Sequence, residues 1–397
     1  MMKRIFRKRT LHQLMHLCVI SISFILSLLI RIFYRKEIWL IGERYDEARD
    51  NGMHLFKYIR LNHPEKKVYY VISDDSPDRP NVATYGQVIK YRSLKHYFYY
   101  CLCKKHVSTH LTGTAPDDKV TPLFIKKLTR SRKFVSLQHG VTKDYMPLLT
   151  KDQAGLDLLV CSAYPEYVFV KEKFGYKDDE VRYLGMCRFD GLYNAKTRNQ
   201  ILLMPTFRMW FWGHEKNHIE KKRQEIFLES HYYKTYQAFI NNESLIDLLE
   251  KSQATLVFYP HYEIQGFIHL FSTPSDRIII ADKSSYDVQA LLKSSKLLVT
   301  DYSSVFFDFS YMRKPLIFYQ FDYEEYRRHH YSEGYFSYQN HGFGPVLTKE
   351  SQVIPMLASM IEKDYKMEEV YLKRVDEFFK LSDQNNTERN YEAIEKL

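Results

Sequence analysis

Lys296-Leu-Leu-Val-Thr-Asp-Tyr-Ser-Ser304 is the stretch that decides the fold class of this chain. Its apolar run, residues 297–299, predicts a buried parallel strand, and residues 301–304 predict a turn beyond the carboxyl end of that strand. A helix is expected to begin at this turn, and residues 315–319 predict the next strand. In such a strand, turn, helix and strand unit, ligands bind outside the carboxyl ends of the strands.

Two interpretations are open for the serines of this turn. A helix start carries unpaired backbone N–H groups and the positive end of the helix dipole, so two hydroxyls beside it suit a phosphate. The alternative is that Ser303 and Ser304 only cap the helix. The choice between the two depends on the polar residues that come after the other strands of the chain.

The composition is that of a globular protein with two ordinary domains. Of the 397 residues, 45% are hydrophobic and 27% are charged, so wholesale disorder is excluded. The net charge of +10 suits an anionic partner, such as a lipid surface, nucleic acid or a phosphorylated substrate. Because the chain contains no nucleic-acid-binding motif, we expect no nucleic acid partner.

The cysteines are too few and too scattered for a disulfide framework or a zinc site. There are five, an odd number with one C-x-C pair: Cys18, Cys101, Cys103, Cys161 and Cys187. We therefore expect a reducing compartment and mostly buried thiols.

The N-terminus predicts a membrane-associating segment at residues 1–36. A basic head at residues 1–9 precedes a nearly uninterrupted apolar run at residues 14–30, which Arg31, Arg35 and Lys36 close. This run is at the lower length limit for spanning a bilayer, and no small-residue cleavage site comes after it, so a removed signal peptide is not expected. A full span and an in-plane anchor on anionic lipid both fit the pattern, and the alternative is a buried core helix.

From residue 37 onward, short apolar runs alternate with helical stretches. Residues 38–42 and 106–111 are two of the predicted strands. The alternation predicts an α/β fold with mostly parallel sheets that helices cover on both faces. Because the polar segment 193–200 interrupts the alternation, we expect two Rossmann-like domains, at residues 37–195 and 196–397.

Four polar clusters each come directly after a predicted strand, and together they have the chemistry of phosphate transfer. The carboxyl ends of parallel strands lie along one edge of a sheet, so these clusters are expected to gather there. Cationic side chains can offset the charge of a diphosphate, hydroxyls and amides can donate hydrogen bonds to it, and a histidine can take a proton from an incoming hydroxyl. The clusters are Gln138-His139-Gly140, Pro205-Thr206-Phe207-Arg208, Pro260-His261 and Asp301-Tyr302-Ser303-Ser304.

Within this chemistry, His139 is the predicted base, and Arg208 and His261 are predicted to offset negative charge. No glycine-rich nucleotide loop and no clustered Asp/Glu metal pattern occurs in the sequence. We therefore expect no metal ion and no further cofactor.

With these motifs in order, the chain resembles the CDP-glycerol glycerophosphotransferases that build teichoic acids and related capsular polymers, including their ribitol-phosphate relatives. The resemblance runs from about residue 37 to residue 397. Its motifs are Leu137-Gln-His-Gly-Val141, Met204-Pro-Thr-Phe-Arg208, Tyr259-Pro-His261, Val299-Thr-Asp-Tyr-Ser-Ser-Val-Phe-Phe-Asp308, Lys314-Pro-Leu-Ile-Phe318 and Asp322-Tyr-Glu-Glu-Tyr326. One departure is Gln138, which stands where many members have Trp before the His-Gly pair.

The resemblance implies a GT-B fold, an N-terminal acceptor domain facing a C-terminal donor-binding domain across a cleft. It also implies an enzyme on the cytoplasmic face of the cell membrane. This enzyme would transfer a polyol phosphate from CDP-glycerol or CDP-ribitol to a lipid-linked glycan or teichoic acid acceptor and release CMP. By the same resemblance, His139 would be the catalytic base. His261 would be the second catalytic residue and would contact the donor diphosphate. The donor-binding residues would be Arg208, Asp301, Ser303, Ser304, Thr206 and Gly140.

Two other functions stay open at this point. One is a GT-B glycosyltransferase that uses a nucleotide sugar, because a fold does not fix the donor. The other is a basic protein of the membrane surface, or one that binds nucleic acid, without catalytic turnover. No long domain precedes the segment with these motifs, so the sequence gives no indication of added glycosyl transfer.

Overall fold

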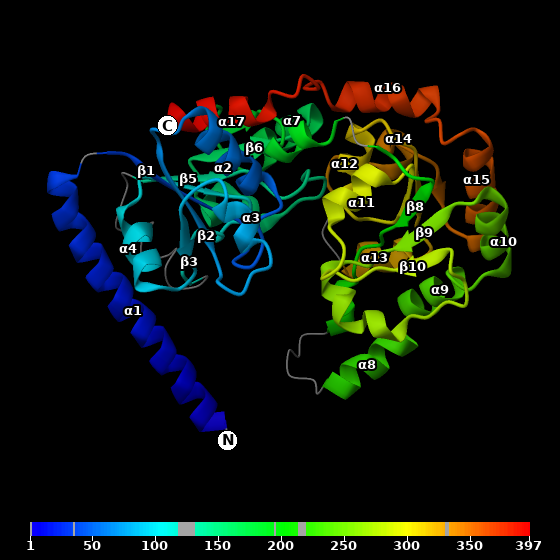
Figure 1. Cartoon of the computed structure of the whole chain (residues 1–397), viewed down its shortest axis with the longest axis horizontal. Helices are drawn as coiled ribbons and strands as arrows, with labels where there is room; N and C mark the ends of the chain where they lie inside the picture. Colours follow the sequence, from blue (N-terminus) through cyan, green and yellow to red (C-terminus); the bar gives the residue numbers. More distant parts are fainter. Residues whose placement is uncertain (1, 35, 118–131, 194–195, 213–219, 330–332) are drawn as a thin grey trace. The chain divides into compact units, whose positions relative to one another are not determined.

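The computed structural model describes residues 2–34, 36–117, 132–193, 196–212, 220–329 and 333–397 (Figure 1). The chain forms two compact units. The first unit comprises residues 1–141, 147–191 and 381–397, and the second comprises residues 142–146 and 192–380. Arg35 and residues 194–195 of the predicted linker lie outside the described residues.

The first unit is built on a seven-stranded parallel sheet with the order β3-β2-β1-β4-β5-β6-β7. Neighbouring residues of its interior strand β1 point to opposite faces, and each face is packed. Trp39 and Ile41 belong to one apolar core together with Phe56 of α2 (Asn51–Asn62), whereas Leu40 belongs to a second core with Tyr100 of α4 (Leu94–Leu102). The strands are β1 (Ile38–Gly42), β2 (Lys67–Ile72), β3 (Val88–Lys90), β4 (Lys105–Ser108), β5 (Lys133–Ser136), β6 (Leu158–Cys161) and β7 (Val181–Tyr183).

The C-terminal helix α17 (Asn386–Glu395) packs in the first unit, although the sequence-based boundaries place it in the second domain. Its Ile394 is fully buried in the core that contains Trp39, and Figure 1 shows α17, in red, beside α2. The Asp190 carboxylate fixes the start of the helix by accepting hydrogen bonds from the backbone N–H groups of Asn386 and Thr387, at 3.0 and 2.7 Å. The C-terminal segment returns to the first unit because of tertiary packing, which the hydrophobic periodicity of the sequence does not reveal.

The N-terminal helix α1 (Met2–Phe33) packs against α4 along one face. Its segment Gln13–Phe33 is long and apolar enough to cross a membrane. Ile20 is buried in the core beside α4, and Arg31 Nη2 donates to the carbonyl oxygens of Leu102 and Cys103 at 2.8 and 3.1 Å. Most of its large apolar side chains are exposed, so α1 is not a buried core helix.

The second unit has a six-stranded parallel sheet with the order β10-β9-β8-β11-β12-β13. Fully buried side chains such as Leu203, Val299 and Ile317 form its core with the helices that flank the sheet. The strands are β8 (Gln200–Leu203), β9 (Thr255–Phe258), β10 (Ile278–Ile280), β11 (Leu297–Thr300), β12 (Leu316–Tyr319) and β13 (Val346–Leu347). The main helices are α8 (Glu220–Glu229), α9 (His231–Phe239), α10 (Glu243–Ser252), α11 (Val288–Ser294), α12 (Val305–Tyr311), α13 (Tyr323–His329), α14 (Tyr338–His341), α15 (Glu350–Glu362) and α16 (Glu369–Phe378).

The predicted unit of strand, turn, helix and strand is confirmed as β11, α12 and β12. Both strands are completely buried and pair in parallel, with Val299 opposite Ile317. Of the five cysteines, all of which are free thiols, four are buried and Cys18 is exposed, in agreement with the prediction.

Candidate active site

In the second sheet, the direction of strand succession reverses between the neighbouring strands β8 and β11. Open α/β sheets bind ligands in the crevice at such a reversal. Thr206 lies after β8 and Asp301 lies after β11, and the backbone N–H of Thr206 donates to Asp301 Oδ1 at 2.8 Å. The structure therefore brings together two of the segments that the sequence predicts to bind the donor.

Arg208 lies fully buried beside this pair, and its charge is balanced inside the protein. Its Nε and Nη2 donate to the two carboxylate oxygens of Asp322, at 2.6 and 3.0 Å, and its Nη1 lies 2.9 Å from Asp301 Oδ2. Desolvation opposes the charged form, but Asp301 and Asp322 raise the pKa of Arg208 well above its ordinary value. A direct contact of Arg208 with the donor stays a prediction. The structure shows a clamp that ties the loops after β8, β11 and β12 together.

Asp301 is a buried anchor of the same clamp. Its carboxylate accepts hydrogen bonds from the backbone N–H of Thr206 and from the Tyr236 hydroxyl, the latter at 3.3 Å. Burial raises the pKa of Asp301, and Arg208 opposes that shift. Because Thr206, Tyr236 and Arg208 all contact the carboxyl group, Asp301 fixes the shape of the turn that leads to Ser303.

His261 lies after β9, against the loop that leaves β8. Its ring stacks on Phe207 with a centroid distance of 4.7 Å, and its backbone N–H donates to Pro205 O at 3.2 Å. Nδ1 accepts a hydrogen bond from the backbone N–H of Glu263 at 3.2 Å. In a neutral ring the proton is therefore on Nε2, which makes that nitrogen a donor.

Ser303 and Ser304 lie at the start of α12. Ser304 is the N-cap residue, yet within the described part of the chain its side chain makes no capping hydrogen bond. Backbone contacts hold the turn instead, because the N–H groups of Phe306 and Phe307 donate to the carbonyl oxygens of Ser303 and Ser304. The structure thus does not use the Ser304 hydroxyl as a cap, although its role in binding a phosphate stays a prediction.

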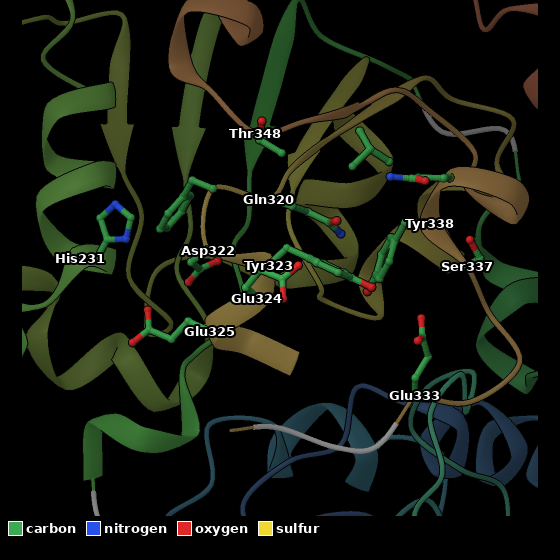
Figure 2. Close-up of a pocket in the computed structure, with 13 residues that line it drawn as sticks. His231, Gln320, Asp322, Tyr323, Glu324, Glu325, Glu333, Ser337, Tyr338 and Thr348 are labelled. Carbon is green, nitrogen blue, oxygen red and sulfur yellow. The ribbon is translucent and has the colours of Figure 1, made fainter. Parts of the chain in front are cut away.

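A cavity of about 640 Å³ opens beside this turn, at the carboxyl ends of β12 and β13 (Figure 2). Its lining is rich in carboxylates and aromatic rings, which distinguishes it from a phosphate site. The lining residues are His231, Gln320, Phe321, Asp322, Tyr323, Glu324, Glu325, Glu333, Ser337, Tyr338, Gln339, Val346 and Thr348. A smaller cavity of about 390 Å³ shares His231, Asp322 and Glu325 with it and includes Arg208.

Two side chains of the larger cavity hold the backbone of the serine turn. Gln320 Nε2 donates to Asp301 O at 3.1 Å, and the Tyr338 hydroxyl donates to Tyr302 O at 3.4 Å. The Tyr302 hydroxyl in turn donates to Asp322 Oδ1 at 3.1 Å. The turn before α12 therefore borders the cavity, and its shape is fixed by residues of the cavity wall.

In the first unit, His139 lies after β5 and is exposed at the surface. The preceding residue, Gln138, has a left-handed backbone conformation with φ of 56°, which is unusual for a residue with a side chain. Its peptide is held because Gln138 O accepts from Asn51 Nδ2 at 2.7 Å, and its side chain is buried with Nε2 donating to Val160 O at 2.8 Å. Gln138 is therefore an internal support of the His139 loop in this chain, and Gly140 is buried next to it.

The pKa of His139 lies below its ordinary value. Desolvation by the surrounding residues is the largest cause, although part of His139 reaches solvent; Asp50 opposes the shift, whereas Arg188 and Arg44 add to it. A lowered pKa keeps the imidazole neutral around pH 7, as a base requires.

Sequence reasoning missed His110, whose ring stacks on His139 at a centroid distance of 4.8 Å. Residues 106–111 were predicted as one strand, but β4 ends at Ser108 and His110 lies in the loop beyond it. The chain leaves the sheet because the Ser108 hydroxyl donates to His110 O, and the N–H of Gly113 donates to the same oxygen at 3.1 Å. The residue that could have indicated the end of the strand is Gly113. A Cβ at this position would lie 2.2 Å from Glu43 O, so this turn requires glycine.

The described residues contain no group of three or more His, Cys, Asp and Glu side chains that could hold a metal ion.

Comparison with known proteins gives relatives across almost the whole chain. Minor teichoic acid biosynthesis protein GgaB of Bacillus subtilis is 36% identical over 381 residues, which cover 92% of this chain and 40% of GgaB. A teichoic acid poly(glycerol phosphate) polymerase of Bacillus spizizenii is 27% identical over 277 residues, which cover 69% of this chain and 67% of that protein. This chain thus spans about two fifths of the length of GgaB.

A solved structure of the wall teichoic acid polymerase TagF confirms the predicted GT-B type of fold. The TM-score is 0.68 at 17% identity, and the match covers 98% of this chain and 97% of that chain. The family model described as CDP-glycerol:poly(glycerophosphate) glycerophosphotransferase matches residues 23–396. The chain belongs to the family of CDP-glycerol:poly(glycerophosphate) glycerophosphotransferases.

Proposed function

We propose that this protein transfers a polyol phosphate from CDP-glycerol or CDP-ribitol to a lipid-linked glycan or teichoic acid acceptor. An acceptor hydroxyl attacks the phosphorus that bears the polyol, the new P–O bond forms, and the bond to CMP breaks. The observation that carries the proposal is the buried clamp of Arg208, Asp301 and Asp322, which fixes a serine turn beside a nucleoside-sized cavity. Family membership supports the same reaction.

The charges of the second unit support a division of the donor between two places. A diphosphate is repelled by the carboxylates of the cavity, so it is assigned to the turn, where Ser303, Ser304, Thr206 and the Nε2–H of His261 can donate to it. The cytidine is assigned to the cavity. There, Glu324 and other carboxylates can accept hydrogen bonds from ribose hydroxyls and from the cytosine amino group, and aromatic rings can pack on the base.

A feature of the first unit supports the assignment of the donor to the second. In Rossmann-like folds, the start of the first helix after β1 is an anion site. In the first unit the chain's own Glu43 occupies that position, where its carboxyl group accepts from the backbone N–H groups of Arg49, Asp50 and Met53 at 2.9, 3.0 and 2.7 Å. Burial raises the pKa of Glu43 to about 8. A donor phosphate would have to displace this buried carboxyl group, so the first unit is assigned to the acceptor and to the base His139, and Gly140 is no longer assigned to the donor.

The proposal is tested by incubating the full-length protein with an acceptor and a panel of nucleotide donors. CDP-glycerol or CDP-ribitol is expected to release CMP in amounts equal to the polyol phosphate added. A sugar donor such as UDP-glucose would release UDP instead. Turnover with a nucleotide sugar, and none with either CDP-polyol, would contradict the proposal.

Replacing Gln320 by Met is expected to raise the KM for the CDP donor by about tenfold with little change in kcat. The substitution keeps the volume but removes the hydrogen bond to Asp301 O, and an unsatisfied buried carbonyl costs about 1–3 kcal/mol. The turn that is assigned to the diphosphate therefore loses one of its supports. Steady-state kinetics at varied donor concentration measure the change in KM.

The matched control is Gln237→Met, in which a half-buried glutamine away from the cavity loses a similar bond to Ser272 O and the KM is expected to stay unchanged. Equal KM values for the two variants would remove Gln320 from the site.

We also propose that α1 anchors the protein to an anionic membrane. Its polar His16, Ser23 and Ser27 are buried, whereas its outward face consists of apolar side chains. Ile22, Ile25, Leu29 and Ile32 are 55–65% exposed and recur at the spacing of one helix face. An apolar face turned outward, with basic residues at both ends of the segment, suits a bilayer with anionic head groups.

Replacing Ile25 and Leu29 by Asp is expected to shift most of the protein from the membrane pellet to the supernatant. Each apolar side chain contributes about 1.5–3 kcal/mol to burial in lipid, so the bound fraction should fall at least tenfold. Removing residues 1–34 should have the same effect. Sedimentation with vesicles that contain anionic lipid measures the bound fraction. The control is Leu61→Asp, which changes an exposed apolar position on α2. A double variant that still sediments would assign the anchor to another surface.

A further inference from the structure

The ring of His110 lies face to face with the ring of His139 in the first unit. The centroids are 4.8 Å apart and the planes are inclined by only 9°. The two histidines lie just beyond neighbouring strands, β4 and β5, whose ends are in register with Ser108 opposite Ser136. The pair is therefore a feature of the carboxyl edge of the sheet, where α/β folds place functional groups.

The first turn of α2 holds both of the loops that carry these rings. The N–H of Gly52 donates to Thr109 Oγ1 at 3.1 Å, next to His110. Asn51 Nδ2 donates to Gln138 O at 2.7 Å, next to His139. Because neighbouring residues of one helix fix both loops, the stacked arrangement is set by the backbone and does not depend on the rings alone.

His110 does not have the contacts of an ordinary structural histidine. Its Nδ1 is buried and has no hydrogen-bond partner among the described residues. Buried polar nitrogens are almost always paired, so an unpaired one beside a functional residue calls for an explanation. Here the unpaired nitrogen belongs to the ring that covers one face of His139.

The charged groups around the pair come from three other elements. They are Arg44 after β1, Asp50 at the start of α2, and Arg188 in η2 (Cys187–Gly191), whose Nη1 lies 2.6 Å from Asp50 Oδ1. Desolvation, followed by the charge of His139, lowers the pKa of His110 to about 3. His110 is therefore neutral at pH 7 and acts on His139 as an uncharged aromatic ring.

We propose that His110 is a positioning residue for the base His139: its stacked ring fixes the orientation of the His139 imidazole and keeps water from one face of it. This proposal rests on the proposed function. In the reaction, the acceptor O–H proton passes to His139 as the acceptor oxygen bonds to phosphorus and CMP departs. The proton then leaves His139 for solvent. A fixed, partly desolvated imidazole starts this step neutral and in the orientation that the transfer requires.

The test compares His110→Ala with His110→Phe in the full-length protein. Loss of the ring exposes His139 to water, so its pKa should rise in His110→Ala and the acid limb of the kcat profile should move to higher pH. At neutral pH we expect kcat to fall by about 10–100-fold with a KM for the donor within about twofold. His110→Phe keeps the ring face, and both the titration and most of the activity should stay as in the wild type.

NMR titration of protein labelled at histidine, with the His139 signal assigned from His139→Gln, reads the effect without any substrate. Should His110→Ala fail to fold, His110→Gln has the same expectation, because it keeps volume but lacks an aromatic face. The proposal is overturned by a His139 titration that is the same in the wild type and His110→Ala. It is also overturned if His110→Phe loses as much activity as His110→Ala. If the titration shifts as expected but the wild type transfers no polyol phosphate, the stacking role stands and the proposed function falls.

Discussion

Replacing His139 by Ala is expected to reduce polyol phosphate transfer by about 10³-fold while CDP-glycerol still binds. A general base contributes about 10²–10⁴-fold to such a step, because without it the acceptor hydroxyl must lose its proton to water. Donor binding should persist because the donor is assigned to residues of the second unit, whereas His139 lies on the β5 loop of the first. Single-turnover transfer and isothermal titration with the CDP donor measure the two effects separately.

The control for this variant is His269→Ala, which removes an exposed histidine from the end of η4 (Tyr262–Leu270). It should transfer at the wild-type rate. Full activity of His139→Ala would remove His139 from the role of base, and loss of donor binding together with transfer would place its effect on the donor site instead.

Replacing Arg208 by Met is expected to lower the free energy of unfolding of the second unit by about 3–5 kcal/mol. The guanidinium is completely buried between the carboxylates of Asp301 and Asp322, and its removal leaves two buried acidic groups without a cation. The aromatic rings of Tyr302 and Tyr232, 5.1 and 5.2 Å from the guanidinium carbon, cannot replace that charge. Urea unfolding followed by tyrosine and tryptophan fluorescence measures the loss.

Arg277→Met is the matched control, because Arg277 pairs with Glu250 on the surface at 3.2 Å. Partly exposed pairs of this kind contribute at most about 1 kcal/mol. If both arginine variants unfold at the same urea concentration, Arg208 does not hold the second unit together, and the purpose of its charge must be sought in direct contact with a ligand.

The fold and the gathering of polar residues at one edge of the second sheet could be predicted because each depends on local patterns. A strand buried on both faces is a short continuous apolar run, and such runs occur at β8, β9, β11 and β12. The polar residues beyond such strands must lie at the carboxyl edge of a parallel sheet. Thr206 and Asp301 could therefore be placed on neighbouring loops without knowledge of their partners.

Other features could not be predicted because they depend on residues that are distant in the chain. One of them is the pairing of Arg208 with Asp322, 114 residues later, which balances the charge of Arg208 inside the protein. The Asp322-Tyr-Glu-Glu-Tyr326 motif had no assigned function, and the structure shows that its carboxylates line the larger cavity. His110 was missed for a local reason. The pattern of residues 106–111 favours one continuous strand, but the strand ends at Ser108 because Ser108 and Gly113 both donate hydrogen bonds to His110 O.

The most direct test of the proposed transfer is the mass of a synthetic lipid-linked acceptor after incubation with the full-length protein and each CDP-polyol. We expect the acceptor to gain whole polyol phosphate units from at least one of the two donors, with one CMP released for each unit, and His139→Ala to add none in the same time. An acceptor of unchanged mass with both donors, or equal gains from the wild type and His139→Ala, would contradict it.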